Sequence, residues 1–600
     1  MDGSAPFTHM IEPLYFGDPS APLFGVLNRA RPGSALDRGV LICAPLGYEN
    51  VIYYRQLAIL ARRLSDGGKS TFRFDWPGCG DSAGDDRQPG LIAASLASVG
   101  LAVAALRAYT GVTHVDVVGL RVGATLAAAA IAGGLDVEDV VLWDPFTSGR
   151  AYVRAMRAFD RLSYGAHEVI EERSDGGQPA SGFILSASSI EELGGLDLLQ
   201  LEFGAKRRLL IAGRDGPPEE ALVDHYRGQD HDVTTTVFEG LREAALGWTE
   251  RPVPTDSFAR IEAWLSPGEP LPATPAQAVT PLTTRCELTV HGAAVSEESV
   301  LLADGSPMLG VAATPAAAPY GDAWVVFLPN RYARRIGPNR LYTEWARAWA
   351  AAGVPSLRID VSGTGDAGGP DEETDRDMYR AEAVNDVLRS VRFLRERYDA
   401  RRFAVMGLCS GGYIGFHAAL DEPAIVETIL LNPQMLLWTD QETAVTRAGI
   451  LRRGVVRPSS WRKLFVDRGA LMKAVLPVVG EALVSDIRWR FGRLLRRNED
   501  RGGKLSVRSW IIRAIDRLES RRCAVVFVFS EADPGVGYLA RHLGKDLTGL
   551  AGRPGVAIET VDGADHTFRQ AGRQAVLRGL LEGHLAAAGF SVGSAGDTPT

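Results

Sequence analysis

Cysteine is scarce in this chain, and its distribution excludes two kinds of structure. Five cysteines occur among 600 residues, and they are widely scattered. They are Cys43, Cys79, Cys286, Cys409 and Cys523. An odd, scattered set predicts neither a disulfide framework nor a site built on paired metal-ligating cysteines, and it suits a reducing compartment.

The chain also lacks an excess of positive charge and a long apolar run. Its formal net charge is -8, which gives no reason to expect nucleic-acid binding. The first ten residues contain no basic region followed by an apolar stretch, so no signal peptide is expected. The most apolar window, Leu91–Leu106, is too short to span a bilayer and is expected to form a buried helix. A cytoplasmic location is the resulting expectation.

Six hundred residues exceed what one hydrophobic core can organise, so length predicts two or more domains. Closely spaced prolines between Leu265 and Thr284 predict an extended connector. The last residues are small and polar and are expected to be disordered. The predicted organisation is a first domain at 1–265, a proline-rich linker at 266–284, a second domain at 285–591 and a tail at 592–600.

The two predicted domains repeat one order of elements. The matching segments are APLFGVL (21–27) with SPMLGVA (306–312), GVLICAPLGY (39–48) with AWVVFLPNRY (323–332), the following helix in each half, FRFDWPGCGDSAG (72–84) with LRIDVSGTGDAGG (357–369), and VDVVGLRVGATLAAAA (115–130) with FAVMGLCSGGYIGFHAA (403–419). Strands that alternate with helices predict a mostly parallel sheet with helices on both faces. The predicted fold class is therefore α/β, with a duplicated domain.

The second half contains a candidate nucleophile. Residues 407–411 read Gly-Leu-Cys-Ser-Gly, after a short apolar strand and before a helix. This is the layout of a nucleophile elbow, with Cys409 in the serine position. Glycines two residues away on either side suit a turn too sharp for bulky side chains. The helix N-terminus would favour a thiolate at Cys409. A buried structural cysteine on a glycine-rich turn is the alternative interpretation.

Two downstream residues complete a candidate triad. Asp533 follows the apolar strand CAVVFVFS, and His566 follows the strand VAIETV. The chain order nucleophile, acid, histidine is the order expected of a nucleophile-elbow hydrolase. His566 is expected to take the thiol proton and deliver it to the leaving group, and Asp533 to orient the imidazole and stabilise its cationic form.

Other polar residues near these positions have weaker claims or different roles. Asp565 is the alternative acid. His417 lies two helical turns past the elbow, so packing or surface exposure is its expected role. The backbone N–H of Ser410 is expected to face an oxyanion, with a second donor from the loop near Asn330 or Arg331.

Both halves resemble the α/β-hydrolase superfamily. DWPGCGDS (75–82) and GADHTF (563–568) are similar to its lipase-like and serine-aminopeptidase-like branch. The GxCxGG variant at 407–412 is similar to polyester synthases, which hold acyl chains on a cysteine, and dienelactone hydrolases also use cysteine. The resemblance implies two tandem α/β-hydrolase domains, and it omits the linker, about 435–520, and the tail.

Alignment of the two halves predicts that the first half is a degenerate copy of the second. Cys409 falls on Arg121, Asp533 on Asp215 and His566 on Glu243. Arginine is neither a nucleophile at neutral pH nor a proton shuttle. The first half is therefore expected to serve packing and to shape the second site. Arg121 either binds a carboxylate or phosphate, or forms an ion pair with Glu243 that closes the vacated cavity.

A basic, helix-like segment interrupts the second half. From Arg447 to Arg522, twenty Lys or Arg face seven Asp or Glu, a net charge of +13. The resemblance implies that the insertion at about 435–520 is a lid over the site. Part of such a charge run is a solvated face. The asymmetry also predicts an acidic partner, either an acyl carrier protein with its phosphopantetheine arm or coenzyme A, with an anionic membrane surface as the alternative.

The leading functional hypothesis is acyl transfer or hydrolysis through a Cys409 thioester, by an acyltransferase or thioesterase. Thiolates are good nucleophiles and acyl exchange between sulfurs is nearly isoenergetic, so a carrier- or coenzyme A-bound acyl donor is favoured. No metal and no cofactor are expected. An esterase, lactonase or peptidase acting on a small molecule is the alternative within enzymes. A non-catalytic docking scaffold is the alternative outside them.

Overall fold

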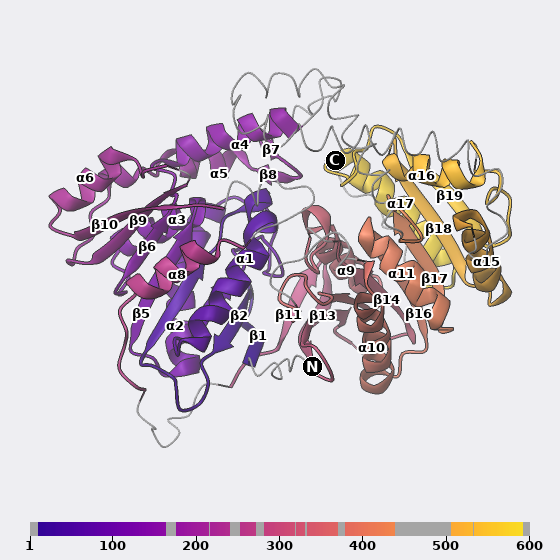
Figure 1. Cartoon of the computed structure of the whole chain (residues 1–600), viewed down its shortest axis with the longest axis horizontal. Helices are drawn as coiled ribbons and strands as arrows, with labels where there is room; N and C mark the ends of the chain where they lie inside the picture. Colours follow the sequence, from indigo (N-terminus) through magenta and orange to yellow (C-terminus); the bar gives the residue numbers. More distant parts are fainter. Residues whose placement is uncertain are drawn as a thin grey trace.

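The computed structural model describes residues 10–163, 176–214, 216–240, 253–271, 281–317, 320–330, 333–369, 379–438, 506–531, 533–545 and 547–591. Two large sheets lie side by side, one in each half of the chain, and helices flank both of them (Figure 1). We refer to residues 10–271 as the first half and to residues 281–591 as the second half. The fold is α/β, as the sequence predicts.

The sheet of the first half has eight strands, in the order β1-β2-β4-β3-β5-β6-β9-β10. β1 and β2 pair in antiparallel fashion, as do β2 and β4, and the other strands are parallel. The strands are β1 (Met10–Phe16), β2 (Leu23–Arg29), β3 (Arg38–Cys43), β4 (Thr71–Phe74), β5 (His114–Leu120), β6 (Val140–Trp143), β9 (Arg208–Arg214) and β10 (Asp232–Phe238), with a separate hairpin of β7 (Gln178–Ala180) and β8 (Phe183–Leu185).

The sheet of the second half has nine strands, in the order β11-β12-β13-β15-β14-β16-β17-β18-β19. Apart from the additional β11, this is the strand order of the first sheet, as expected of a repeated chain. The strands are β11 (Arg285–Val290), β12 (Ala293–Leu302), β13 (Met308–Pro315), β14 (Ala323–Leu328), β15 (Ser356–Ile359), β16 (Arg402–Leu408), β17 (Ile425–Leu431), β18 (Ala524–Ser530) and β19 (Val556–Val561).

Helices cover both faces of each sheet because the central strands are apolar on both sides. In the first half, α2, α3, α4 and α6 pack on one face, and α1 and α8 pack on the other. The helices are α1 (Gly47–Asp66), α2 (Leu91–Thr110), α3 (Val122–Ala132), α4 (Gly149–Ser163), α5 (Ala187–Gly194), η1 (Leu198–Gln200), α6 (Glu220–Gly228) and α8 (Thr255–Trp264).

The second half repeats this layering. α10, α11, α15 and α16 pack on one face of its sheet, and α9 and α17 on the other. The helices are η2 (Pro338–Arg340), α9 (Leu341–Ala351), α10 (Ala381–Tyr398), α11 (Ser410–Asp421), α15 (Val507–Ser520), α16 (Pro534–Leu543) and α17 (Ala571–Ala587). Most of the predicted lid and the tail lie outside the described residues.

The two halves share a small apolar core at their junction. Ile11, Tyr15, Phe24 and Val26 of the first half cluster with Leu309 and Val311 of the second. The halves are therefore in direct contact through this core. Separately, the start of the predicted linker packs on the first half, where Pro270 forms a bridge with Leu36.

The apolar helix α2 is longer than the window seen in the sequence. It spans 20 residues, Leu91–Thr110, so it is long and apolar enough to cross a membrane by length and composition. The expectation that it is too short is wrong, because the helix continues through Arg107 to Thr110. Half of its apolar window is nevertheless buried inside the protein, where it packs against the sheet.

Candidate functional site

Cys409 stands on a sharp turn between β16 and α11. Its backbone adopts φ 56° and ψ -114°, a left-handed conformation that a non-glycine residue rarely takes. The turn requires glycine on both sides. A β-carbon added at Gly407 would lie 2.3 Å from the Gly411 carbonyl carbon, and one added at Gly411 would lie 2.7 Å from the Leu328 oxygen. The strand, turn and helix of a nucleophile elbow are all present.

Asp533 and His566 meet at the carboxyl ends of neighbouring strands. Asp533 follows β18 and caps α16, accepting a hydrogen bond of 2.7 Å from the Gly535 N–H. Its other carboxylate oxygen, Oδ2, lies 2.7 Å from His566 Nδ1. The Asp533 side chain is fully buried, whereas the His566 side chain is 38% exposed. The carboxylate is therefore held in place, and one side of the ring stays accessible.

The imidazole of His566 also interacts electrostatically with Cys409. Burial opposes protonation of the ring, but the hydrogen bond with Asp533 and the neighbouring Cys409 outweigh it and raise the pKa of His566 well above its ordinary value. Because Asp533 engages Nδ1, Nε2 is the nitrogen left for the thiol. Asp533 thus orients the ring, and Cys409 is close enough to affect its protonation.

Two residues that the sequence analysis did not identify hold this arrangement. Asn432, directly after β17, donates 2.9 Å to the His566 carbonyl and accepts 2.7 Å from the Ser530 N–H. Gln434 donates 3.0 Å to Asp533 Oδ1. Both side chains are buried. Both residues follow β17, which lies between the strand of the nucleophile, β16, and the strand of the acid, β18. Their position after this strand is the signal that could have identified them.

The alternative acid and the neighbouring histidine have other partners. Asp565 forms an ion pair with Arg569 and accepts from the N–H groups of Thr567 and Arg569, so it stabilises its own loop. His417 lies 3.0 Å from the Leu436 carbonyl and stacks on Trp510. Asp533 is therefore the carboxylate on the His566 ring, and His417 has the packing role expected of it.

Two of the residues expected to bind an oxyanion, Ser410 and Asn330, lie at or near the elbow. Ser410 is the first residue of α11 and is buried. Asn330 is buried after β14, and its side chain accepts 2.6 Å from the Ala333 N–H. The close approach of Gly411 to Leu328 places the end of β14 against the elbow. Arg331 lies outside the described residues.

The first half keeps the turn but not the nucleophile. Arg121 has φ 57° and ψ -129°, nearly the backbone conformation of Cys409. Its guanidinium donates 2.9 Å to Glu49 and 2.6 Å to Asp144, and it lies 4.1 Å from the centre of the Phe146 ring. Two carboxylates of the first half thus already neutralise the arginine, and an incoming anion would have to compete with them.

Neither Asp215 nor Glu243, the predicted counterparts of the acid and the histidine, lies within the described residues. The partners observed for Arg121 are Glu49 and Asp144, which the sequence analysis did not name. Among the residues that the structure describes, no group of three or more His, Cys, Asp or Glu side chains is placed to hold a metal ion.

Comparisons with known proteins agree with the fold of the second half. Residues 337–578 match the sequence model of the alpha/beta hydrolase family. No curated protein sequence matches the chain. Among solved structures, an esterase from Pyrococcus furiosus matches at 14% identity with a TM-score of 0.33, covering 50% of this chain and 91% of its own.

Two further solved structures are similar at the same level. A dienelactone hydrolase from Anabaena variabilis matches at 11% identity with a TM-score of 0.28, covering 48% of this chain and 97% of its own. An alpha-beta serine hydrolase homologue from Coxiella burnetii matches at 14% identity with a TM-score of 0.28, with the same coverage of 48% and 97%.

Proposed function

We propose that the second half catalyses acyl transfer or hydrolysis through a thioester on Cys409. The observation that carries this proposal is the 2.7 Å contact of His566 Nδ1 with Asp533, next to a cysteine held on a strained turn between β16 and α11. The raised pKa of His566 supports it, because an imidazole that holds a proton well can take one from the thiol. The alpha/beta hydrolase match over residues 337–578 supports the general reaction class.

The first chemical step forms the acyl-enzyme. Nε2 of His566 removes the Sγ proton of Cys409, and the sulfur attacks the acyl carbonyl carbon. Backbone N–H groups at Ser410 and near Asn330 bind the oxyanion of the tetrahedral intermediate. The intermediate collapses, the bond to the leaving group breaks, and the leaving group takes the proton from the imidazolium. Asp533 keeps the ring oriented and stabilises its cationic form throughout.

The second step releases the acyl group. A water molecule or another acceptor gives its proton to His566 and attacks the thioester carbonyl. The second intermediate collapses, and the imidazolium returns the proton to the Cys409 sulfur. Water as acceptor makes the protein a thioesterase, and any other acceptor makes it an acyltransferase. The same residues serve both outcomes.

The proposed acyl donor is a thioester on coenzyme A or on an acyl carrier protein. Acyl exchange between two sulfurs is nearly isoenergetic, so a cysteine nucleophile suits a thioester donor. The net charge of +13 between Arg447 and Arg522 would attract the phosphates of either donor, as well as an acidic carrier. α15 contributes Arg508, Arg513 and Arg517 to this positive charge within the described residues.

Intact-mass measurement tests the proposal. The full chain is incubated with a panel of acyl-coenzyme A donors, acyl carrier thioesters and activated oxyesters. We expect a mass gain of one acyl group that Cys409→Ala abolishes. Cys286→Ala is the matched control, because burial raises the pKa of Cys286 to about 12 and leaves it a poor nucleophile. Labelling by oxyesters alone favours the esterase alternative, and no labelling by any donor favours the docking scaffold.

A further inference from the structure

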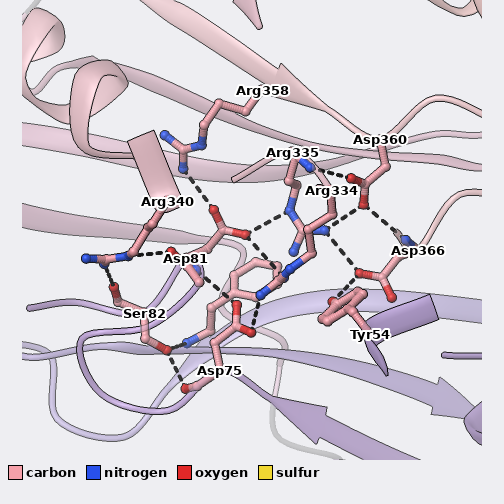
Figure 2. A network of polar contacts seen from close by, with 12 residues as sticks. Tyr54, Asp75, Asp81, Ser82, Arg334, Arg335, Arg340, Arg358, Asp360 and Asp366 are labelled. Carbon is pink, nitrogen blue, oxygen red and sulfur yellow. Dashed lines mark hydrogen bonds and ion pairs between the residues drawn. The ribbon is translucent and has the colours of Figure 1, made fainter. Parts of the chain in front are cut away.

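A buried network of ion pairs joins the two halves (Figure 2). Five arginines and five carboxylates take part in it, so the formal charges balance. They are Arg73, Arg334, Arg335, Arg347 and Arg358 with Asp75, Asp81, Glu297, Asp360 and Asp366. Each of these side chains is at most 8% exposed. So many buried charges at one junction are costly unless their geometry is maintained.

Part of the network is symmetric between the halves. Arg73 of the first half pairs with Asp366 of the second at 2.5 Å. The residues 285 positions away from these, Arg358 and Asp81, form the reciprocal pair at 3.1 Å. Each half thus offers one arginine and one aspartate to the other. These reciprocal ion pairs join the two halves.

A second reciprocal contact runs from arginines to loop carbonyls. Arg55 donates 3.2 Å to the Gly365 carbonyl and 2.6 Å to the Ala367 carbonyl. Arg340 makes the equivalent contacts in the other direction, to the carbonyls of Gly80 at 2.9 Å and Ser82 at 2.8 Å. This second contact is therefore also reciprocal between the halves.

The segment that follows Asn330 breaks this symmetry. We call Arg334 and Arg335 the clamp arginines. Arg334 reaches Asp75 at 2.5 Å and stacks 3.8 Å above the Tyr54 ring, both in the first half. Arg335 reaches Asp81 at 2.8 Å. The corresponding stretch of the first half, Glu49 to Val51, contains no cation.

The clamp arginines lie a few residues from the expected oxyanion donor. The side chain of Asn330 is tied to the N–H of Ala333, the residue directly before the clamp. The Arg335 N–H donates 2.7 Å to Asp360, which fixes the other end of the segment. A shift of the clamp would therefore move the backbone at Asn330, which lies beside the elbow.

We propose that the first half positions the oxyanion-binding loop of the second half. Asp75 and Asp81 are the positioning residues, and they act through the clamp arginines. The degenerate half is thereby a required part of the neighbouring active site. This inference rests on the proposed function, because only acyl chemistry develops an oxyanion at this position.

The test separates acyl chemistry from thiol reactivity in the full chain. Acylation of Cys409 by p-nitrophenyl acetate develops an oxyanion, whereas alkylation by iodoacetamide does not. In Asp75→Asn we expect single-turnover acylation to slow by about 10- to 100-fold, since a small misplacement of an oxyanion donor has effects of this size. The alkylation rate should stay at the wild-type value. Ser299→Ala is the matched control, because it removes a cross-half hydrogen bond of 3.2 Å to the Pro13 carbonyl that involves no residue of the network. Both of its rates should be unchanged.

A conservative variant covers the case in which Asp75→Asn fails to fold. Arg334→Lys keeps the charge opposite Asp75 but loses the planar fork, so it should slow acylation while preserving the fold. Wild-type acylation in a folded Asp75→Asn or Arg334→Lys variant would overturn the inference, as would an equal loss in Ser299→Ala. Absence of acylation in the wild type would overturn the proposed function itself, and the inference with it.

Discussion

Neutralising Asp81 should destabilise both halves of the protein. The Asp81 side chain is fully buried between two fully buried guanidinium groups, at 2.8 Å from Arg335 and 3.1 Å from Arg358. Asp81→Asn keeps the shape but leaves one positive charge of the network uncompensated. Breaking a buried ion pair in this way costs about 3–5 kcal/mol. We expect the lower end, about 3 kcal/mol, because Arg335 retains Asp360 and Arg358 retains Glu297.

The pH dependence of this effect follows from the pKa of Asp81. Burial alone would raise it, but Arg335 and Arg358 outweigh burial and hold it below its ordinary value. A carboxylate with a lowered pKa in the folded state contributes stability above its unfolded pKa and loses it as the pH falls through the folded value. The difference between wild type and Asp81→Asn should therefore be complete at pH 7 and shrink only below about pH 4.

Urea denaturation of the full chain, followed by tryptophan fluorescence, measures the loss. The matched control is Asp230→Asn, which removes the partner of Lys206 from a surface pair whose side chains are 88% and 64% exposed. Such a pair contributes about 0–1 kcal/mol. A loss in Asp81→Asn no larger than that of the control would refute the claim that the network stabilises the junction.

Two further substitutions test the site itself. Asp533→Asn removes the anion beside His566, so the pKa of that ring should fall toward its ordinary value. Cys409 acylation should then slow by about 10²–10⁴-fold, as measured by single-turnover rates against pH. An unchanged rate and pH profile would contradict the role assigned to Asp533. Gly411→Ala would place a β-carbon 2.7 Å from the Leu328 oxygen and should abolish acylation or folding. Gly537→Ala has open space at its β-carbon, so it should retain wild-type acylation and circular dichroism. Equal behaviour of the two alanine variants would argue against a tightly packed elbow.

Much of the fold, the turn at Cys409 and the contact between Asp533 and His566 could be predicted from the sequence, because they depend on local patterns. The glycines at 407 and 411 predicted the turn, and the ends of two apolar strands predicted the positions of Asp533 and His566. The order of strands in both sheets agrees with the repeated segments. These signals are all contained in short stretches of chain.

The remaining features depend on contacts between distant residues. Asn432 and Gln434 follow a predicted strand near the site, but that position alone does not show that their side chains reach His566 and Asp533. Asp75 and Asp81 belong to a motif that indicated only a family resemblance, and their ion pairs with the second half require knowledge of how the halves dock. Docking geometry is set by long-range packing, which a local pattern does not encode.

The most direct test of the central claim is site-mapped acylation of Cys409 in wild type and in His566→Gln. After brief exposure to an acyl-coenzyme A donor or to p-nitrophenyl acetate, the acyl group is located by peptide mass spectrometry and its rate of appearance is measured. We expect the adduct on Cys409 and a rate about 10²–10⁴-fold lower in His566→Gln. An adduct elsewhere, or equal rates in the two proteins, would contradict a thiol activated by this imidazole.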